Sequence, residues 1–137
     1  NMPQETAAAL SNGWLRTGDI AQIDDEGYVY LIDREKDLII SGGENVYSSE
    51  VETALYQHPD IHECAVIGTD DERLGQVVTA VIVAKPETSL NSKAIIDHCR
   101  KLIGGYKIPR RIEFVEAMPK NELGKILKNR LRDTYAE

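Results

Sequence analysis

The stretch 33–45, DREKDLIISGGEN, constrains the fold of this 137-residue chain more than any other part of its sequence. It begins with a charged turn at Asp33, continues through the apolar run 38–40 and reaches the tandem glycines Gly42 and Gly43. Tandem glycines let the backbone adopt positive φ and approach a ligand closely, although a plain turn is the commoner reason for such a pair. A charged turn, a short strand and a glycine loop in direct succession predict a pivot joined to a ligand-facing loop.

The segment 1–32 is predicted to lack a hydrophobic core of its own. Its pattern favours strands at 20–23 and 28–32, with the polar turn DDEG between them. A lone hairpin is marginally stable in water. This hairpin exposes Trp14, Leu15 and other apolar side chains unless another part of the protein covers them.

From residue 38 onward the pattern is that of a self-sufficient α+β domain. The expected strands are 38–40, 61–68, 76–84 and 111–115, and the expected helices are 48–59, 91–102 and 126–135. The run 76–84 is rich in Val and Ile, which predicts a central strand, and Ser49 with Glu52 fits a capping box. We therefore expect a small, mostly antiparallel sheet with flanking helices, preceded by a β-hairpin segment.

The net charge of −7 argues against a protein that binds nucleic acid or an anionic membrane surface. The charge is unevenly distributed, because residues 1–99 hold 6 basic and 18 acidic residues and residues 100–137 hold 10 basic and 5 acidic residues. The basic C-terminal part is either a solvated face or a surface that meets phosphate groups.

Other composition features exclude several classes of site. The sequence has no run of about 18 apolar residues, so no membrane span is expected. Cys64 and Cys99 lack CxxC spacing, which favours reduced, buried thiols in a cytoplasmic protein. His58, His62 and His98 have no ligand spacing, so no metal site is expected from them.

Two single residues stand out as candidates for chemistry. Asp19 follows Thr17 and Gly18, and its carboxylate is suited to accept hydrogen bonds from both hydroxyls of a ribose, although a turn aspartate is the alternative. Lys125 follows Gly124 in a loop just before the last expected helix. An ammonium on a flexible four-carbon stem reaches into a cleft as a point charge, but most Gly-Lys pairs have no function.

Together, the motifs WLRTGD, DRxKDxIxxGGEN and ELGKILK, in this order, resemble the C-terminal end of an acyl-CoA synthetase (acid–CoA ligase). These enzymes belong to the adenylate-forming, AMP-binding superfamily, and the resemblance runs from Pro3 to Arg132. It implies that 1–32 is the closing segment of a large N-terminal AMP-binding domain. It further implies a hinge at 33–37 and a C-terminal mobile lid domain at 38–137.

The resemblance also implies roles in adenylation. Asp19 matches the aspartate that binds the ATP ribose, Arg34 matches an arginine that contacts the nucleotide, and Asp33 matches the hinge position. An exposed ion pair of little energetic value is the alternative for Asp33 and Arg34. Lys125 matches the catalytic lysine of adenylation, but Leu123 occupies the position before Gly-Lys where the family usually has Ser or Thr.

A second set of residues resembles the channel through which the pantetheine arm of coenzyme A reaches the acyl group. Gly42, Gly43 and Glu44 match the loop that lines this channel, where larger side chains would block a long, thin arm. Lys107 lies in a basic segment that the resemblance places near the coenzyme A phosphates, with a solvated charge as the alternative.

The implied reaction has two steps. A carboxylic acid and ATP form acyl-AMP and pyrophosphate, and the thiol of coenzyme A then displaces AMP. The resemblance implies Mg²⁺, bound mainly by the N-terminal domain, and a role in fatty acid metabolism in the cytoplasm. Expected partners are the protein's own N-terminal domain and, through exposed residues 1–32, a possible second copy of the chain. The isolated chain is expected to be inactive.

Two alternatives remain at this point. The first is an adenylation domain that loads a carrier protein, although the form GGENVY of the glycine loop favours coenzyme A ligases. The second is a non-enzymatic α+β interaction or regulatory module.

Overall fold

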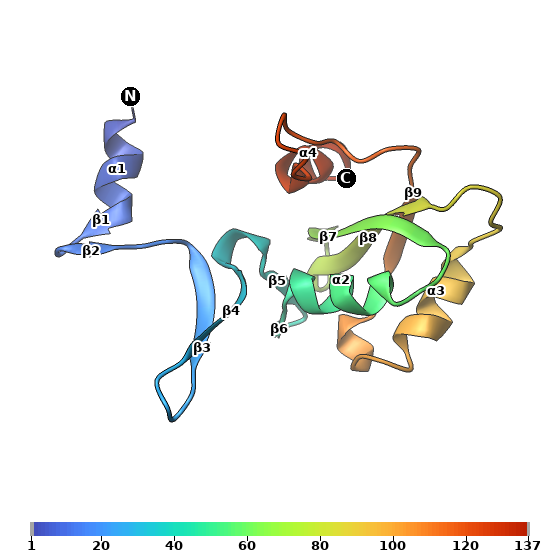
Figure 1. The fold of residues 1–137 in the computed structure, drawn as a ribbon, viewed down its shortest axis with the longest axis horizontal. Helices are drawn as coiled ribbons and strands as arrows, with labels where there is room; N and C mark the ends of the chain where they lie inside the picture. The colour runs from blue at the N-terminus through green and yellow to red at the C-terminus, as the bar shows by residue number, and fades with distance from the viewer. Residues whose placement is uncertain (1, 137) are drawn as a thin grey trace. The chain divides into compact units, whose positions relative to one another are not determined.

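The computed structural model describes residues 2–136, and the chain divides into two compact units (Figure 1). The N-terminal unit ends at Lys36, and the C-terminal unit begins at Asp37. This boundary lies inside the interval 33–37, which the sequence predicts to be a hinge.

The N-terminal unit consists of one short helix and two small antiparallel strand pairs, β1 with β2 and β3 with β4. Its elements are α1 (Pro3–Ala9), β1 (Leu10–Ser11), β2 (Trp14–Leu15), β3 (Asp19–Ile23), β4 (Val29–Arg34) and the beginning of the 3-10 turn η1 (Glu35–Asp37). The turn between β3 and β4 closes on Asp24, whose Oδ1 accepts hydrogen bonds from the backbone N–H groups of Glu26 and Tyr28. The hairpin predicted from the sequence is therefore present.

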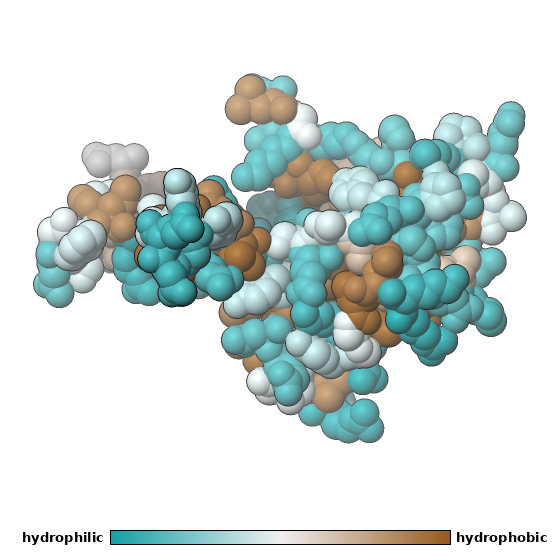
Figure 2. Space-filling model, turned by 60° about the horizontal axis from the view of Figure 1, so that its bottom comes forward, coloured by the Kyte–Doolittle hydropathy of each residue, from teal (hydrophilic) through white to brown (hydrophobic). Residues whose placement is uncertain are grey.

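The described part of the N-terminal unit contains no buried residue. Trp14 is 79% exposed and Leu31 is 73% exposed, and Figure 2 shows apolar side chains among hydrophilic ones on the surface of this unit. Hydrogen bonds hold its hairpins together, but residues 2–36 form no buried apolar layer on either face of them. The apolar surface is of the kind that marks an interface with another part of a protein.

The C-terminal unit is built on a five-stranded sheet with the strand order β6-β5-β8-β7, and β9 pairs with β8. The pairing of β9 with β8 is parallel and the other pairings are antiparallel. The elements are β5 (Ile39–Ser41), β6 (Glu44–Val46), α2 (Ser48–Tyr56), β7 (Ile61–Asp71), β8 (Gly75–Ala84), α3 (Ser92–Cys99), η2 (Gly105–Lys107), β9 (Arg111–Phe114) and α4 (Lys128–Thr134). The α+β fold is confirmed.

Strand β8 lies at the centre of the hydrophobic core, because side chains of other elements pack against both of its faces. Residues 77–83 are all buried, and within this run Val78, Ala80 and Ile82 belong to one cluster and Val81 and Val83 to the other. Val78 and Ile82 face the cluster that includes α2 and α3, whereas Val81 and Val83 face the cluster that includes α4. Figure 1 shows α4 on one side of the sheet and α2 with α3 on the other. A continuous apolar run is the pattern expected of a strand buried on both faces.

The edge strand β7 is protected by side chains of α2. Glu52 accepts a hydrogen bond from the backbone N–H of Val66 at 2.8 Å, and the Tyr56 hydroxyl lies 3.3 Å from both the N and the O of Cys64. The predicted capping box of Ser49 and Glu52 is wrong, because α2 has no side-chain cap and its N-cap residue is Tyr47. Glu52 instead covers a free backbone group at the sheet edge, where an unpaired strand invites association.

Both cysteines are free and buried in this core, as predicted. Burial raises the pKa of the Cys64 thiol to about 12 and also raises the pKa of Cys99.

Candidate functional site

Asp19 and Arg34 lie side by side at one end of the β3–β4 hairpin. The strand register pairs these two residues directly, and Arg34 Nε lies 3.2 Å from Asp19 Oδ1. Next to the pair is an open hollow of about 280 Å³, lined by Thr17, Gly18, Arg34, Glu35 and Lys36. The motifs TGD and DREK, which are separated in sequence, therefore meet at one polar surface.

Asp33 occupies the next position of the same hairpin. It pairs with Ile20, beside the irregularity between Ile20 and Ala21, and its Oδ1 accepts a hydrogen bond from the backbone N–H of Arg34 at 2.7 Å. Asp33 thus lies at the end of a strand, shortly before the boundary between the two units. Hinges are commonly found at such ends of elements.

The tandem glycines form the tip of the β5–β6 hairpin. Gly42 has φ +59° and Gly43 has φ +87°, which matches a two-residue hairpin turn of the primed type. The hairpin is held against the β7–β8 turn and the start of β8. The N–H of Gly42 donates to the carbonyl of Leu74 in that turn at 2.9 Å, and the N–H of Ile40 donates to Gln76 Oε1 at 3.0 Å. The sequence suggested a loop here and missed strand β6, whose residues Glu44 and Asn45 are polar and exposed.

Lys107 lies close to this hairpin, because η2 packs against β6. Its ammonium is 2.6 Å from one oxygen of Glu50 and 2.7 Å from the other. The hydrogen bond with Glu50 raises the pKa of Lys107. A phosphate group at Lys107 would therefore compete with a carboxylate already in place.

Lys125 lies in a separate loop, 119–127, which we call the lysine loop. Lys125 is exposed, and within residues 2–136 its ammonium has no hydrogen-bond or ion-pair partner. The next lysine, Lys128, is fixed instead, since its Nζ lies 2.7 Å from Glu52 Oε1 and donates to Ser48 Oγ at 2.8 Å. Leu123, the departure from the family pattern, is 93% exposed and takes part in no apolar packing.

The glycine hairpin and the lysine loop lie at opposite edges of the sheet. The glycine hairpin contains the edge strand β6, whereas Lys120 of the lysine loop forms an ion pair with Glu63 on the other edge strand, β7. Two strands, β5 and β8, separate β6 from β7. The C-terminal unit therefore carries two different candidate loops on two different sides.

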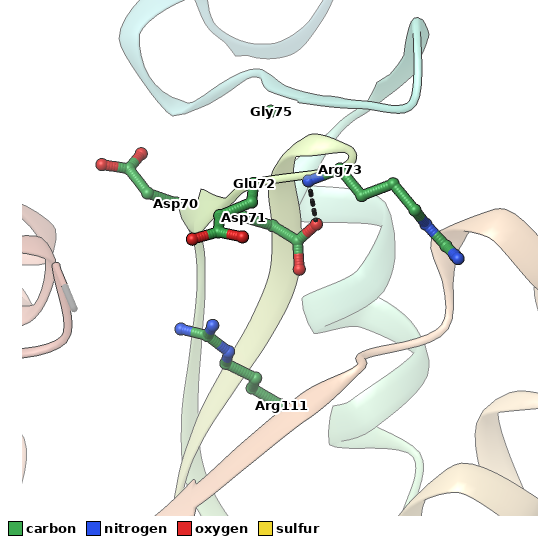
Figure 3. A pocket seen from close by; sticks show the side chains of 6 residues that line it. All are labelled: Asp70, Asp71, Glu72, Arg73, Gly75 and Arg111. Atoms are coloured by element: carbon green, nitrogen blue, oxygen red, sulfur yellow. Dashed lines mark hydrogen bonds between the residues drawn. The ribbon is translucent and has the colours of Figure 1, made fainter.

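A larger open hollow, of about 710 Å³, lies at the turn between β7 and β8 (Figure 3). It is lined by Asp70, Asp71, Glu72, Arg73, Gly75 and Arg111. Of these, Arg111 belongs to the basic segment that the sequence resemblance places near the coenzyme A phosphates, and the other five were not expected at a site. The Asp71 carboxylate accepts hydrogen bonds from the N–H groups of Leu74 and Arg73, and these bonds lower its pKa. Figure 3 shows the Arg111 guanidinium directed toward this turn. Asp71 is thus engaged in closing the turn.

Two negative findings concern residues 2–136. No group of three or more His, Cys, Asp and Glu side chains there is arranged to hold a metal ion. Over the same residues, the helices are too short and too polar to cross a bilayer.

Comparisons with known proteins agree with the motifs. A family model described as the AMP-binding enzyme C-terminal domain matches residues 50–125. A long-chain-fatty-acid–CoA ligase of Mycobacterium tuberculosis is 47% identical over 136 residues, which cover 99% of this chain and 27% of that protein. A 2-succinylbenzoate–CoA ligase of Geobacillus kaustophilus is 45% identical over 130 residues, which cover 95% of this chain and 26% of that protein.

Solved structures show the same similarity. The ATP-bound crystal structure of MatB from Rhodopseudomonas palustris is similar to this chain with a TM-score of 0.91 at 35% identity, covering 100% of this chain and 27% of MatB. The chain thus spans about a quarter of the length of the proteins that it matches. The resemblance predicted from the three sequence motifs is confirmed.

Proposed function

Because the chain belongs to the family of AMP-binding enzyme C-terminal domains, we propose that it is the C-terminal part of an acid–CoA ligase. In the first step of the reaction, a carboxylate oxygen attacks the α-phosphorus of ATP, which forms acyl-AMP and releases pyrophosphate. In the second step, the thiol sulfur of coenzyme A attacks the acyl carbon, and AMP leaves. Residues 1–32 close the N-terminal domain, 33–37 form the hinge, and 38–137 form the lid.

The position of the two loops at opposite edges of one sheet is the observation that carries this proposal. Loops attached to opposite edge strands favour presentation to one reaction centre in turn, and not both at once. A lid that turns about the hinge at Asp33 can present them in succession. Lys125 serves the first step, and the glycine hairpin serves the second.

In the first step the charged residues bind the nucleotide and neutralise the negative charge that develops on its phosphoryl oxygens. Asp19 accepts hydrogen bonds from the ribose hydroxyls, and the adjacent guanidinium of Arg34 binds the nucleotide. Negative charge grows on the phosphoryl oxygens while the carboxylate attacks. An ammonium placed there stabilises the transition state by about 3–4 kcal/mol. The unpaired ammonium of Lys125 is suited to this role.

In the second step the glycine hairpin forms one wall of the channel for the pantetheine arm. Its tip exposes backbone where a side chain would occupy the channel, and a Cβ at Gly42 would come within 3.2 Å of the Leu74 side chain. Gly43 and Glu44 extend the same wall. Lys107 stands beside it and is proposed to meet a coenzyme A phosphate in exchange for Glu50.

The substrates follow from these roles as ATP, coenzyme A and a carboxylic acid. Mg²⁺ accompanies ATP and is assigned mainly to the N-terminal domain. Relatives named for different acids match this chain to a similar degree, which supports selection of the acid outside it. The Mycobacterium relative supports a role in fatty acid metabolism, and the free thiols support a cytoplasmic location. The exposed apolar residues of the N-terminal unit are assigned to contacts with the N-terminal domain or with a second copy.

Separate assays of the two half-reactions test this proposal in the full-length enzyme. Lys125→Ala is expected to lower acid-dependent ATP–pyrophosphate exchange by about 10²–10³-fold, because one charged donor to the transition state is lost. Given preformed acyl-AMP and coenzyme A, the same variant is expected to form thioester at a nearly normal rate. Gly43→Leu is expected to do the reverse, since it narrows the channel. Equal damage to both half-reactions by Lys125→Ala contradicts the proposal.

Two controls accompany this experiment. Lys85→Ala removes another exposed lysine, far from both loops in sequence, and is expected to leave both half-reactions unchanged. The isolated 137-residue chain is expected to catalyse neither, because aligning the substrates contributes roughly 7–11 kcal/mol and this chain supplies only part of the site.

A further inference from the structure

The lysine loop is closed at its base by backbone contacts. Lys120 and Ile126 form an antiparallel bridge, and the N–H of Leu127 donates to the carbonyl of Pro119 at 2.8 Å. The residues between them, including Lys125, therefore form a short, hairpin-like loop and not an extended connection.

One side chain organises the interior of this loop. Asn121 Oδ1 accepts hydrogen bonds from the N–H of Leu123 at 3.1 Å and from the N–H of Lys125 at 2.9 Å. The backbone of Asn121 adds two more, because its N–H donates to the carbonyl of Lys125 and its carbonyl accepts from the N–H of Gly124, each at 2.9 Å. Gly124 has φ +79°, which lets the chain turn tightly around the asparagine. Asparagine is favoured in such turns because its side chain mimics a backbone carbonyl.

These bonds matter for Lys125 because its ammonium is not held by any described group. The ion pairs Lys120–Glu63 and Lys128–Glu52 fasten the two flanks of the loop to the rest of the unit. Between those anchors, the direction in which the Lys125 side chain leaves the loop depends on its backbone. Within residues 2–136, Asn121 is the side chain that bonds the Lys125 backbone N–H.

We propose that Asn121 is the positioning residue for the lysine of the adenylation step. It fixes the Lys125 backbone before the substrate arrives, so that the flexible stem starts from one defined point. The role rests on the proposed function of Lys125, and Asn121 itself touches no substrate. A displacement of about 1 Å at a reacting group can cost on the order of 10²-fold in rate, so loss of the turn is expected to be visible in kcat.

The test uses Asn121→Ala, Asn121→Asp and Lys125→Ala in the full-length enzyme, with Glu122→Ala as the matched control. Glu122 is the exposed neighbour in the same loop, and its side chain takes part in none of the loop's hydrogen bonds. Asn121→Ala is expected to lower kcat of ATP–pyrophosphate exchange by about 10–100-fold, with the KM values for ATP and acid nearly unchanged. Asp retains an oxygen at the position of Oδ1, so Asn121→Asp is expected to recover most of the rate. Thioester formation from preformed acyl-AMP is expected to stay normal in all four variants.

The outcomes separate the two proposals. If Lys125→Ala abolishes adenylation and Asn121→Ala does not, Asn121 is not a positioning residue, although the function of Lys125 stands. If Lys125→Ala leaves adenylation intact, the proposed function itself is wrong. Equal losses in both half-reactions for Asn121→Ala, or no recovery in Asn121→Asp, indicate a general structural role and overturn the inference.

A readout independent of activity is available on this chain. In ¹⁵N-edited NMR spectra, the amide protons of Leu123 and Lys125 are expected to exchange faster in Asn121→Ala than in the unchanged chain or in Asn121→Asp. Amides in β7 are expected to keep their protection, which shows that the domain remains folded. Unchanged exchange at Leu123 and Lys125 contradicts the inference.

Discussion

The two units of this chain contain similar hairpins but differ in what covers them. In the N-terminal unit, β3 and β4 pair in register and still leave Leu31 73% exposed. In the C-terminal unit, helices pack on both faces of the sheet, and Leu55 is fully buried. A hairpin held only by strand pairing is marginally stable in water, so packing of a second layer of structure on the strands determines which hairpins are stable. The C-terminal unit therefore has a hydrophobic core of its own, whereas the described part of the N-terminal unit has no buried residue.

Amide exchange is expected to show the largest difference between the two units. A domain of the size of the C-terminal unit has a free energy of unfolding of about 5–15 kcal/mol, and its central strands exchange only through global opening. We expect the amides of 77–83 to exchange at least ~10³-fold more slowly than those of β3 and β4 in the isolated chain. Mass spectrometry of deuterium uptake measures this. Equal protection from exchange for the amides of 77–83 and of β3 and β4 in a dilute monomer contradicts the comparison of the two units.

A matched pair of core and surface substitutions sharpens the comparison. Leu55→Ala removes a buried side chain and leaves a cavity, which is expected to lower the free energy of unfolding of the C-terminal unit by about 2–5 kcal/mol. Leu31→Ala removes an exposed side chain and is expected to change this free energy of unfolding by less than about 0.5 kcal/mol. Urea unfolding followed by far-ultraviolet circular dichroism measures both values.

The only tryptophan, Trp14, lies in the N-terminal unit, so its fluorescence reports on that unit alone. We expect no cooperative transition in this signal for the isolated chain. A Trp14 transition that shifts together with the circular dichroism in Leu55→Ala shows that the two units unfold as one.

The smallest expected effect is a dependence on pH that belongs to the C-terminal unit, which holds all three histidines. Burial, and then the charge of His98, lower the pKa of His58. The ring of His58 contacts that of His98, and its Nδ1 accepts a hydrogen bond from the N–H of Asp60. Because the pKa of His58 is lower in the folded state, the unfolded state binds more protons at pH values near and below the ordinary histidine pKa of about 6.5. Stability contributed by neutral His58 is therefore present above this pH and is lost as the pH falls.

Urea midpoints at pH 7.5 and pH 5.5 test this expectation. His58→Asn keeps an oxygen that can accept from the Asp60 N–H and cannot become charged, so its midpoint is expected to fall less between the two pH values. If the urea midpoint of His58→Asn falls as steeply between the two pH values as that of the unchanged chain, His58 is not responsible for the dependence of stability on pH.

Most of the fold could be predicted from the sequence because its signals are local. The Val- and Ile-rich run 76–84 has the apolar continuity of a strand buried on both faces, and β8 is Gly75–Ala84. Asn91 accepts a hydrogen bond from the N–H of Ala94 and begins α3, as an N-cap should. Strand β6 was missed because its three residues are too few to show a period.

The contacts within the candidate site were less predictable, because they join residues distant in sequence. The TGD and DREK motifs identified Asp19 and Arg34, but only the hairpin register shows that the two side chains form an ion pair. Glu52 fits a local capping pattern, yet it bonds Val66 and Lys128 instead. Asn121 had a readable signal, since an asparagine three residues before a glycine is typical of a turn.

The burial of both thiols gives the C-terminal unit a practical property. At neutral pH the thiolate is the form that reacts with maleimides, and Cys64, with a pKa of about 12, remains almost entirely protonated. Cys99 is buried in the same cluster, and its pKa is also raised. A dye added to this chain is therefore expected to label a substitution such as Ser89→Cys at the surface and to spare both native residues. Fluorescence energy transfer from such a probe can test whether the C-terminal unit changes its orientation during turnover, without any change to the core of that unit.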